Sequence, residues 1–405
     1  MISDRRSIAT LAPLALIATV IAALSLDSSV AAPAAQTPDI AALVSSVDQQ
    51  RITDHVAAID EPRNAIIHPA QLQATADYLE AQLSSFGYPV TLDPVAFNAT
   101  TFPNVIGVQL GTVCPERVFI VGAHYDSFET TPGADDNASG TAAMLEIARV
   151  LAGTPLPATV WYTGITLEES GLLGSIHMAQ QGAAAGTEVV GMLSLEMIGY
   201  TTAIEDQDAV IVIGNDASIR LVDSFRRASA SFVPSLPQFS GTVAGNGETI
   251  PDIRRSDHAA FWDAGYQAMI VTDGGPARNL NYHLATDTID TLDMPFLTNV
   301  TKAMLATTVE YLTFDGDGDS EPDACTGPLS ATATPTPVAT PTPTPTPEPV
   351  GGIAELPQTG RTELETPASA SDSWVVPTGI AAATVGAIML GATAWLAQRR
   401  RRGSR

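Results

Sequence analysis

Residues 117–169, RVFIVGAHYDSFETTPGADDNASGTAAMLEIARVLAGTPLPATVWYTGITLEE, contain the pattern that decides the fold of this chain. The stretch predicts a strand over Arg117–Ala123, a helix over Ser139–Leu151 and a second strand over Thr159–Leu167. A strand, a helix and a strand in this order favour two parallel strands joined by a crossover helix.

The alternation of strands and helices continues on both sides of this stretch. Residues 71–86 place Leu72, Leu79 and Leu83 at helical spacing, and Gly87 is typical of the residue that follows a helix. The other predicted strands are Val90–Phe97, Asn104–Leu110, Val189–Leu195, Val210–Ile213 and Ala268–Thr272. The other predicted helices are Leu173–Gln181, Ser218–Phe232, Asp257–Ala264 and Met294–Leu312. The sequence therefore predicts one α/β domain over residues 37–314, with a mostly parallel central sheet and helices on both faces.

The N-terminus has the three parts of a secretory signal peptide. Arg5 and Arg6 form a charged start, residues 8–26 are apolar, and the small residues of 29–35 are typical of a cleavage site. Residues 1–35 are therefore predicted to be a signal peptide that is removed on export. A signal anchor that stays uncleaved is the alternative.

A second apolar segment, residues 374–397, lies near the C-terminus and is followed by the arginines of residues 399–402. Its length of about 24 residues is enough to span a bilayer core of roughly 30 Å. Trp374 and Trp395 lie near its two ends, where aromatic side chains favour the membrane interface. We expect one transmembrane helix here, with the basic tail 398–405 in the cytoplasm and the α/β domain on the extracellular face.

Residues 331–373 are predicted to be a disordered stalk, because their repeated Thr-Pro pairs favour an extended polyproline II chain and bury no core. Within the stalk, Leu356–Gly360 spells LPQTG and resembles the sorting signal at which sortases attach proteins to a cell wall. The chain is therefore expected to be exported and held at the cell surface, either by its membrane helix or by a sortase acting at this motif.

The formal net charge of −25 argues against nucleic-acid binding through a basic surface, and it is typical of the solvated surface of an exported protein. The chain has two cysteines, Cys114 and Cys325. Export makes a disulfide between them feasible, although two isolated cysteines do not define a disulfide framework.

Residues 315–330 form an acidic linker after the last predicted helix. Its carboxylates fall at every second position, namely Asp315, Asp317, Asp319, Glu321 and Asp323. This spacing resembles that of calcium-binding loops, so Ca²⁺ is one candidate ligand for the segment. A solvated acidic linker that binds no ion is the alternative.

Acidic and imidazole side chains follow five predicted strands or loops at the same edge of the sheet. They are His124 and Asp126, Asp135 and Asp136, Glu168 and Glu169, Glu196, and His283. Ligands of open α/β sheets bind beyond the carboxyl ends of the strands, which is where these residues lie. Taken singly, Asp136 is compatible with a helix N-cap, and either histidine with a place in the core. Taken together, they favour a metal site.

The kinds of ligand indicate a catalytic rather than a structural metal. Histidine and carboxylate ligands without a thiolate are typical of catalytic zinc sites, which keep a position for water. A carboxylate that bridges two ions allows five side chains to hold two metals, as in binuclear hydrolases. Glu168, which is next to a candidate ligand, has the chemistry of a general base that moves the proton of a water molecule.

Five motifs then identify a resemblance that extends from about residue 60 to residue 312. They are VGAHYDS at 121–127, PGADDNASG at 132–140, EESGLLGS at 168–175, SLEMIGY at 194–200 and NYHLATDT at 281–288. In this order they resemble the co-catalytic zinc aminopeptidases, a family that also includes glutamate carboxypeptidase and transferrin-receptor ectodomains.

The resemblance implies two Zn²⁺ ions and a role for each residue. Asp136 would bridge the ions, Glu169 and His283 would complete one site, and His124 and Glu196 would complete the other. Glu168 would be the general base, Asp126 would orient His124, and Tyr282 would stabilise the oxyanion. In the nearby SDHAAF motif, Asp257 and His258 are interpreted as capping and packing residues near the site.

The expected function is hydrolysis of peptides, with release of the N-terminal residue. A carboxypeptidase, a dipeptidase or another amidase on the same scaffold is one alternative, and a non-catalytic surface adhesin or receptor is another. Recognition of a substrate carboxylate would require an arginine near the metals. Arg254, Arg255 and Arg278 are the candidates in the downstream loops, and the sequence does not place them.

Overall fold

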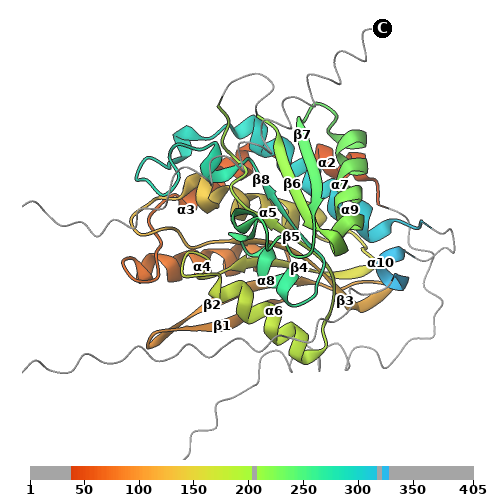
Figure 1. The fold of residues 1–405 in the computed structure, drawn as a ribbon, viewed down its shortest axis with the longest axis horizontal. Coiled ribbons are helices and arrows are strands. Elements are labelled where there is room, and N and C mark those ends of the chain that lie inside the picture. The colour runs from red at the N-terminus through yellow and green to blue at the C-terminus, as the bar shows by residue number, and fades with distance from the viewer. Residues whose placement is uncertain (1–37, 203–207, 317–321, 328–405) are drawn as a thin grey trace, which may run out of the picture.

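The computed structural model describes residues 38–202, 208–316 and 322–327, in which a central sheet lies between two layers of helices (Figure 1). The sheet has eight strands in the order β1-β2-β4-β3-β5-β8-β6-β7. Their bounds are β1 Val90–Phe97, β2 Thr100–Gln109, β3 Cys114–His124, β4 Ala158–Ile165, β5 Glu188–Leu195, β6 Val210–Asn215, β7 Gln238–Val243 and β8 Ala268–Thr272.

The helices connect these strands and cover both faces of the sheet (Figure 1). The α-helices are α2 Ile40–Ser45, α3 Gln49–Ile59, α4 Pro69–Ser85, α5 Gly140–Leu151, α6 Leu173–Ala185, α7 Ile219–Phe232, α8 His258–Asp263, α9 Met294–Thr313 and α10 Asp323–Thr326. Short 3₁₀ turns occur at Asp216–Ser218, Pro251–Arg254, Gly275–Ala277 and Ile289–Thr291, and an irregular turn at Ala134–Ser139, kinked at Asp136 and Asn137, precedes α5.

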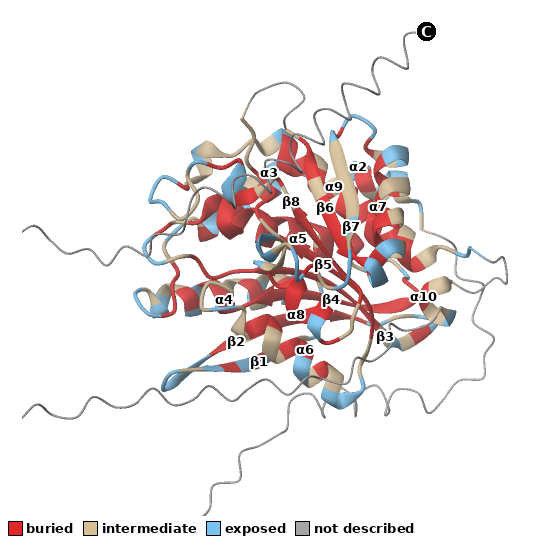
Figure 2. Cartoon of the chain, in the orientation of Figure 1, coloured by how far each residue is buried: buried red, intermediate tan, exposed pale blue. Residues whose placement is uncertain are grey.

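The central strands alternate their side chains between two apolar cores. In β3, Phe119 and Val121 belong to the larger core, which α4, α5, α7 and α9 also line. Val118 and Ile120 belong to a smaller core on the opposite face, together with residues of α6 and α8. The buried centre of the sheet in Figure 2 reflects this double burial, which is also why β3 and β4 are almost continuously apolar in sequence.

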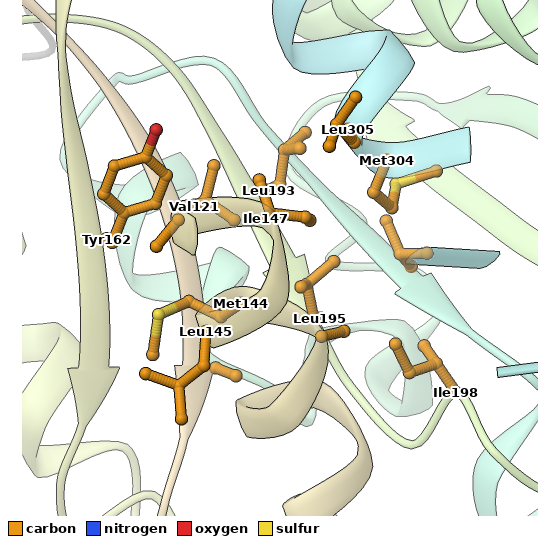
Figure 3. Close-up of a cluster of buried hydrophobic side chains, with 14 of the residues drawn as sticks. Val121, Met144, Leu145, Ile147, Tyr162, Leu193, Leu195, Ile198, Met304 and Leu305 are labelled. Carbon is orange, nitrogen blue, oxygen red and sulfur yellow. The ribbon is translucent and has the colours of Figure 1, made fainter. Parts of the chain in front are cut away.

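Helix α5 lies in the middle of the larger core. Figure 3 shows Met144, Leu145 and Ile147 of this helix beside Val121 and Leu193 of the sheet. Burial of each such side chain contributes about 1.5–3 kcal/mol. Because α5 begins at Gly140, the last residue of the segment 132–140, this packing anchors the segment that carries Asp135 and Asp136.

The centre of the sheet is parallel, antiparallel pairs occur on both sides of it, and the pair β6–β7 at one edge is again parallel. Strands β4, β3, β5 and β8 run parallel to one another, as predicted. The edges differ from the prediction, because β1 pairs antiparallel with β2, β2 antiparallel with β4, and β6 antiparallel with β8. The hairpin explains one edge, since Phe97 pairs with Thr100 and a two-residue turn requires antiparallel strands.

Most predicted elements lie within a few residues of their observed bounds. Helices α2, α3 and α10 and strand β7 were not predicted. Strand β7, QFSGTV, is half-exposed along most of its length, and an edge strand of this kind lacks a clear apolar alternation. Helices α2 and α3 each begin with an aspartate N-cap, Asp39 and Asp48, a signal that the sequence contained.

Several predicted segments lie outside the described residues. They are the signal peptide 1–35, the stalk 331–373 with Leu356–Gly360, the transmembrane helix 374–397 and the tail 398–405. Within the described ranges, the chain forms no helix that is both long and apolar enough to cross a bilayer. Residues 317–321 of the acidic linker are also outside these ranges.

The described C-terminal segment, residues 322–327, is fastened to the start of β3. Cys114 and Cys325 form a disulfide, and Arg117 donates hydrogen bonds to the carbonyl oxygens of Ala324 (3.1 Å) and Gly327 (2.9 Å). This attachment lies at the amino end of β3. The predicted metal ligands lie at the opposite, carboxyl end, where β3 finishes at His124.

Candidate metal centre

Five predicted ligands and Glu168 meet at the carboxyl ends of the central strands. His124 is the last residue of β3, Glu196 directly follows β5, and His283 lies in the loop after β8. Two groups of possible ligand atoms form there, His124 with Glu168 and Glu196, and Asp136 with Glu169 and His283. Within each group the ligand atoms lie within 4.8 Å of one another.

Asp136 belongs to the second group and also faces the first. Its Oδ1 is 3.2 Å from Nε2 of His124, and its Oδ2 is 3.3 Å from Nε2 of His283. His124 Nε2 is also 3.4 Å from Oε2 of Glu196, and His283 Nε2 is 3.3 Å from Oε2 of Glu169. A carboxylate whose two oxygens face two separate ligand groups has the arrangement of a metal bridge.

Unpaired polar atoms at this position fit a bound cation. Nε2 of His124 and Oε1 of Glu169 are buried and have no hydrogen-bond partner among the described residues. Buried polar atoms in proteins are almost always paired, so two such atoms among carboxylates fit coordination of a cation. Imidazole and carboxylate ligands without a thiolate match the ligand set of catalytic zinc.

The buried carboxylates of the site also favour binding of a cation. Burial, followed by the nearby carboxylates of Glu196, Glu169 and Asp257, raises the pKa of Glu168 well above its usual range, although His124 opposes this. Burial raises the pKa of Glu169 to about 7. Desolvation and mutual repulsion of carboxylates both favour a proton or a cation in their midst.

Asp136 is held in place through its own backbone and that of Asp135. Both amides donate to the buried carboxylate of Asp287, from Asp135 to Oδ1 (2.9 Å) and from Asp136 to Oδ2 (3.1 Å). Asn137 accepts hydrogen bonds from the amides of Gly140 and Met197 (both 3.1 Å) and so joins the start of α5 to the end of β5. Asp287 lies in the NYHLATDT motif, but the sequence did not predict this role.

Asp126 lies beside His124, as the resemblance implied, and makes further contacts. Its carboxylate Oδ1 is 3.5 Å from Nδ1 of His124, whereas the hydrogen bond of that nitrogen goes to the backbone oxygen of Asp126 (3.2 Å). The carboxylate of Asp126 also accepts hydrogen bonds from the backbone amides of Glu168 (3.0 Å) and Glu169 (3.1 Å). Asp126 therefore positions the backbone that carries the predicted base and its neighbouring ligand, in addition to lying beside His124.

His283 is held by aromatic stacking. Its ring lies between Phe128, with ring centroids 3.9 Å apart, and Tyr282, with centroids 3.7 Å apart. The backbone of His283 has φ of 58°, in the region that residues with side chains seldom adopt. The sequence did not predict the contribution of Phe128, since nothing in its spacing places it against a residue 155 positions away.

Two further side chains support the site and were not predicted from the sequence. Ser256 donates from Oγ to Oε2 of Glu196 (2.8 Å). Arg63 is fully buried and donates to backbone oxygens on both sides of the loop after β3, including those of Tyr125 (2.6 Å) and Gly133 (2.9 Å). Both contacts join segments that are distant in the chain, which is why local sequence patterns do not reveal them.

The interpretation of Asp257 as a helix cap is wrong. It precedes α8 but makes no side-chain hydrogen bond to the helix, and both of its carboxylate oxygens are buried without a partner among the described residues. Burial raises its pKa to about 7. Its neighbour His258 does pack as expected, edge-on to Trp262 with ring centroids 4.5 Å apart.

Comparison with known families adds a match over the centre of the chain. A family model described as Peptidase family M28 matches residues 104–308. A relative named "Probable zinc metalloprotease" from Pyrenophora teres f. teres (strain 0-1) is 30% identical over 268 residues, 57% of this chain and 53% of the relative. The protein YfbL of Escherichia coli (strain K12), whose function is uncharacterized, is 30% identical over 262 residues, 58% of this chain and 79% of the relative.

A third relative, named "Probable leucine aminopeptidase" from Arthroderma otae, is 34% identical over 194 residues, 44% of this chain and 49% of the relative. The aligned part spans about half the length of the fungal relatives, since it covers 53% of the Pyrenophora protein and 49% of the Arthroderma protein.

Solved structures share the fold. The LapA aminopeptidase of Legionella pneumophila superimposes with a TM-score of 0.58 at 20% identity, over 72% of this chain and 79% of that structure. The aminopeptidase from Aneurinibacillus sp. strain AM-1 gives 0.55 at 18% identity, over 66% and 95%. A Bacteroides thetaiotaomicron glutaminyl cyclase gives 0.51 at 18%, over 65% and 97%, so the fold alone does not distinguish these activities.

Proposed function

Because this chain belongs to peptidase family M28, we propose that it is a zinc-dependent aminopeptidase that releases N-terminal residues from peptides. The observation that supports this most directly is the position of Asp136, whose two carboxylate oxygens face His124 and His283 at 3.2 Å and 3.3 Å. These distances support Asp136 as the side chain that would bridge two ions.

Two Zn²⁺ ions would be held by the residues of these groups. His124 and Glu196 would hold one ion, Glu169 and His283 the other, and Asp136 both. When bound, such a pair of ions lowers the pKa of a water molecule and polarises the carbonyl of the scissile peptide.

Glu168 is proposed as the general base. Its carboxylate lies with His124 and Glu196, while its amide is fixed by Asp126. From this position Glu168 would take a proton from the attacking water and return it to the amine that leaves. Tyr282, beside His283, would donate a hydrogen bond to the oxyanion that develops on the carbonyl.

The location of the enzyme is a separate proposal. The predicted signal peptide 1–35 and the segment 374–397 support export and tethering at the outer face of the cell, by the membrane helix or by a sortase acting at Leu356–Gly360.

The acidic linker is the basis of a further proposal. Carboxylates at alternate positions of 315–323 support Ca²⁺ binding by the linker, which calorimetric titration with Ca²⁺ would test.

Hydrolysis of chromogenic aminoacyl anilides tests the proposed function. The purified domain should release the chromophore, a chelator should abolish the release, and added Zn²⁺ should restore it. N-blocked analogues should be resistant. Equal cleavage of blocked and free substrates would instead indicate an endopeptidase, a carboxypeptidase or another amidase. A domain that holds two zinc ions and cleaves neither kind of substrate would favour the adhesin or receptor alternative.

A further inference from the structure

The three arginines of the downstream loops have different surroundings, and one of them reaches the metal centre. Arg254 makes two hydrogen bonds from Nη2 to the carboxylate of Asp263, at 2.9 Å and 2.7 Å. Arg278 is buried and donates to a backbone oxygen (2.8 Å). Arg255 is exposed, and its Nη2 donates to Oη of Tyr282 (2.9 Å). No carboxylate pairs with Arg255 among the described residues.

The contact between Arg255 and Tyr282 spans the two halves of the site. Arg255 is followed by Ser256, which is hydrogen-bonded to Glu196 in one ligand group (2.8 Å). Tyr282 is followed by His283, which belongs to the other ligand group. Arg255 is therefore next to a residue that touches a proposed ligand, and Tyr282 is next to a proposed ligand and stacks on it.

The ring of Tyr282 has little freedom to move. It stacks on His283 with a centroid distance of 3.7 Å and an interplanar angle of 19°. The guanidinium of Arg255 lies 5.8 Å from the centroid of the same ring, close enough for an additional cation–π attraction. The remaining freedom of this side chain is rotation of its hydroxyl hydrogen.

Arg255 restricts that rotation because of the chemistry of its guanidinium. A guanidinium has hydrogen-bond donors and no acceptor, so it offers nothing to the phenol O–H. By donating to Oη it occupies one lone pair and leaves the O–H to point at a different acceptor. It also polarises the phenol, because hydrogen bonds in a chain strengthen one another.

We propose that Arg255 is a positioning residue that directs the hydroxyl of Tyr282 towards the carbonyl oxygen of the scissile peptide. This inference rests on the proposed peptidase function. It assigns a task to an exposed arginine that makes no ion pair with a described carboxylate, and it identifies Tyr282 as the group through which that arginine acts.

A double-mutant cycle tests the proposal. The variants are Arg255→Ala, Arg255→Lys, Tyr282→Phe and the double variant Arg255→Ala/Tyr282→Phe, with Arg254→Ala as the matched control. Loss of the phenol hydroxyl should lower kcat by about 10²-fold, and Arg255→Ala should lower it by about tenfold with little change in KM. In the Tyr282→Phe background, Arg255→Ala should have almost no further effect. Arg255→Lys should recover part of the rate, and Arg254→Ala should resemble the wild type.

Two outcomes would overturn the proposal. The first is an equal loss of rate on Arg255→Ala with and without the phenol hydroxyl, since Arg255 would then act independently of Tyr282. The second is a rise in KM confined to substrates with a free carboxylate, such as a dipeptide compared with its amide, since Arg255 would then bind the substrate carboxylate. Zinc content should be measured for every variant so that metal loss is not mistaken for either result.

Failure of the proposed function can be separated from failure of this inference. If the wild type hydrolyses no aminoacyl anilide, the proposed function fails. The double-mutant cycle is then measured with a dipeptide phosphinate, whose tetrahedral centre mimics the oxyanion. Calorimetry gives the free energy with which each variant binds it. Coupling between Arg255 and Tyr282 in that binding supports the inference, and additive effects contradict it.

Discussion

Glu168 and Glu169 are neighbours with identical side chains, but their surroundings give them different chemistry. Oε2 of Glu169 lies 3.3 Å from the imidazole of His283, in the group that includes Asp136. Glu168 lies with His124 and Glu196 on the other side of the site. The two residues lie in the turn after β4, where their side chains join different ligand groups.

Replacement of Glu168 separates the proposed base from the ligands. Glu168→Gln keeps the size and polarity of the side chain but removes its ability to accept a proton. We expect kcat to fall by about 10²–10⁴-fold, while the variant retains two zinc ions. Steady-state kinetics with metal analysis checks this, and Glu129→Gln, in an exposed loop nearby, is the control. Loss of zinc from Glu168→Gln would show instead that Glu168 is a ligand.

His258 is expected to make the fold sensitive to acid. Burial lowers its pKa to about 3, while its Nε2 lies 2.6 Å from the backbone oxygen of Ile253. In the unfolded chain a histidine has a pKa of about 6.5, so between these two values only the unfolded state binds the proton. This contribution to stability is complete above about pH 6.5 and is lost as pH falls towards 3, by about 1.4 kcal/mol per pH unit.

Denaturant unfolding at several pH values checks this prediction. The His258→Gln variant retains a hydrogen-bond donor for Ile253 but has no group that titrates. Its stability should therefore fall less steeply than that of the wild type between pH 6 and pH 4, a range chosen to lie within the window given above. Parallel curves for the two proteins would mean that His258 is already protonated in the folded state.

At the scale of elements, the loop between β3 and α5 is the part of the fold on which the site depends most. It carries Asp126, Phe128 and Asp136, and it is held at both ends by side chains from elsewhere. Arg63 donates to the backbone oxygens of Tyr125, Pro132 and Gly133, and Asp287 accepts the amides of Asp135 and Asp136. Contacts with backbone atoms fix the course of the loop irrespective of its side chains.

Arg63→Lys tests this dependence. A lysine keeps the charge but cannot present several donors in one plane, so some of the buried carbonyl oxygens would lose their partner. We expect the free energy of unfolding to fall by about 1.5–3 kcal/mol and zinc to bind more weakly. Chemical denaturation and a competitive zinc titration measure the two effects. Arg226→Lys, on the partly exposed face of α7, is the control and should change neither.

At the scale of the whole molecule, the metal centre and the described C-terminal segment lie at opposite ends of β3. The strand begins at Cys114, in the disulfide, and ends at His124, in the site. Its 11 residues span roughly 35 Å at about 3.3 Å per residue. The last described residue, Gly327, and the candidate metal centre are therefore well separated.

Removal of the disulfide should affect stability and leave catalysis intact. The bond joins cysteines 211 residues apart, so it restricts the unfolded chain considerably. The variant Cys114→Ser/Cys325→Ser should lose about 2–4 kcal/mol of unfolding free energy. Its kcat/KM at a temperature where it is fully folded should match that of the wild type. A clear loss of activity in the folded variant would show that the two ends of β3 are coupled.

By itself, the sequence determined the family, most of the secondary structure and the residues that meet at the metal centre. These follow from local patterns, because apolar periodicity defines each element and the carboxyl ends of neighbouring parallel strands converge. Of the proposed site residues, His124, Glu168, Glu169 and Glu196 lie at or shortly after the end of a strand, and Asp136 lies shortly before α5. His283 lies in a longer loop after β8, where its motif identifies it.

Only the tertiary structure decided how these residues are held. The stacking of Phe128 on His283, the contact of Asp126 with the amides of Glu168 and Glu169, and the hydrogen bond from Arg255 to Tyr282 join segments that are distant in the chain. The antiparallel pairs of the sheet were undetermined for the same reason. A local pattern specifies which face of an element is buried, but the partner on that face is selected by packing of the whole domain.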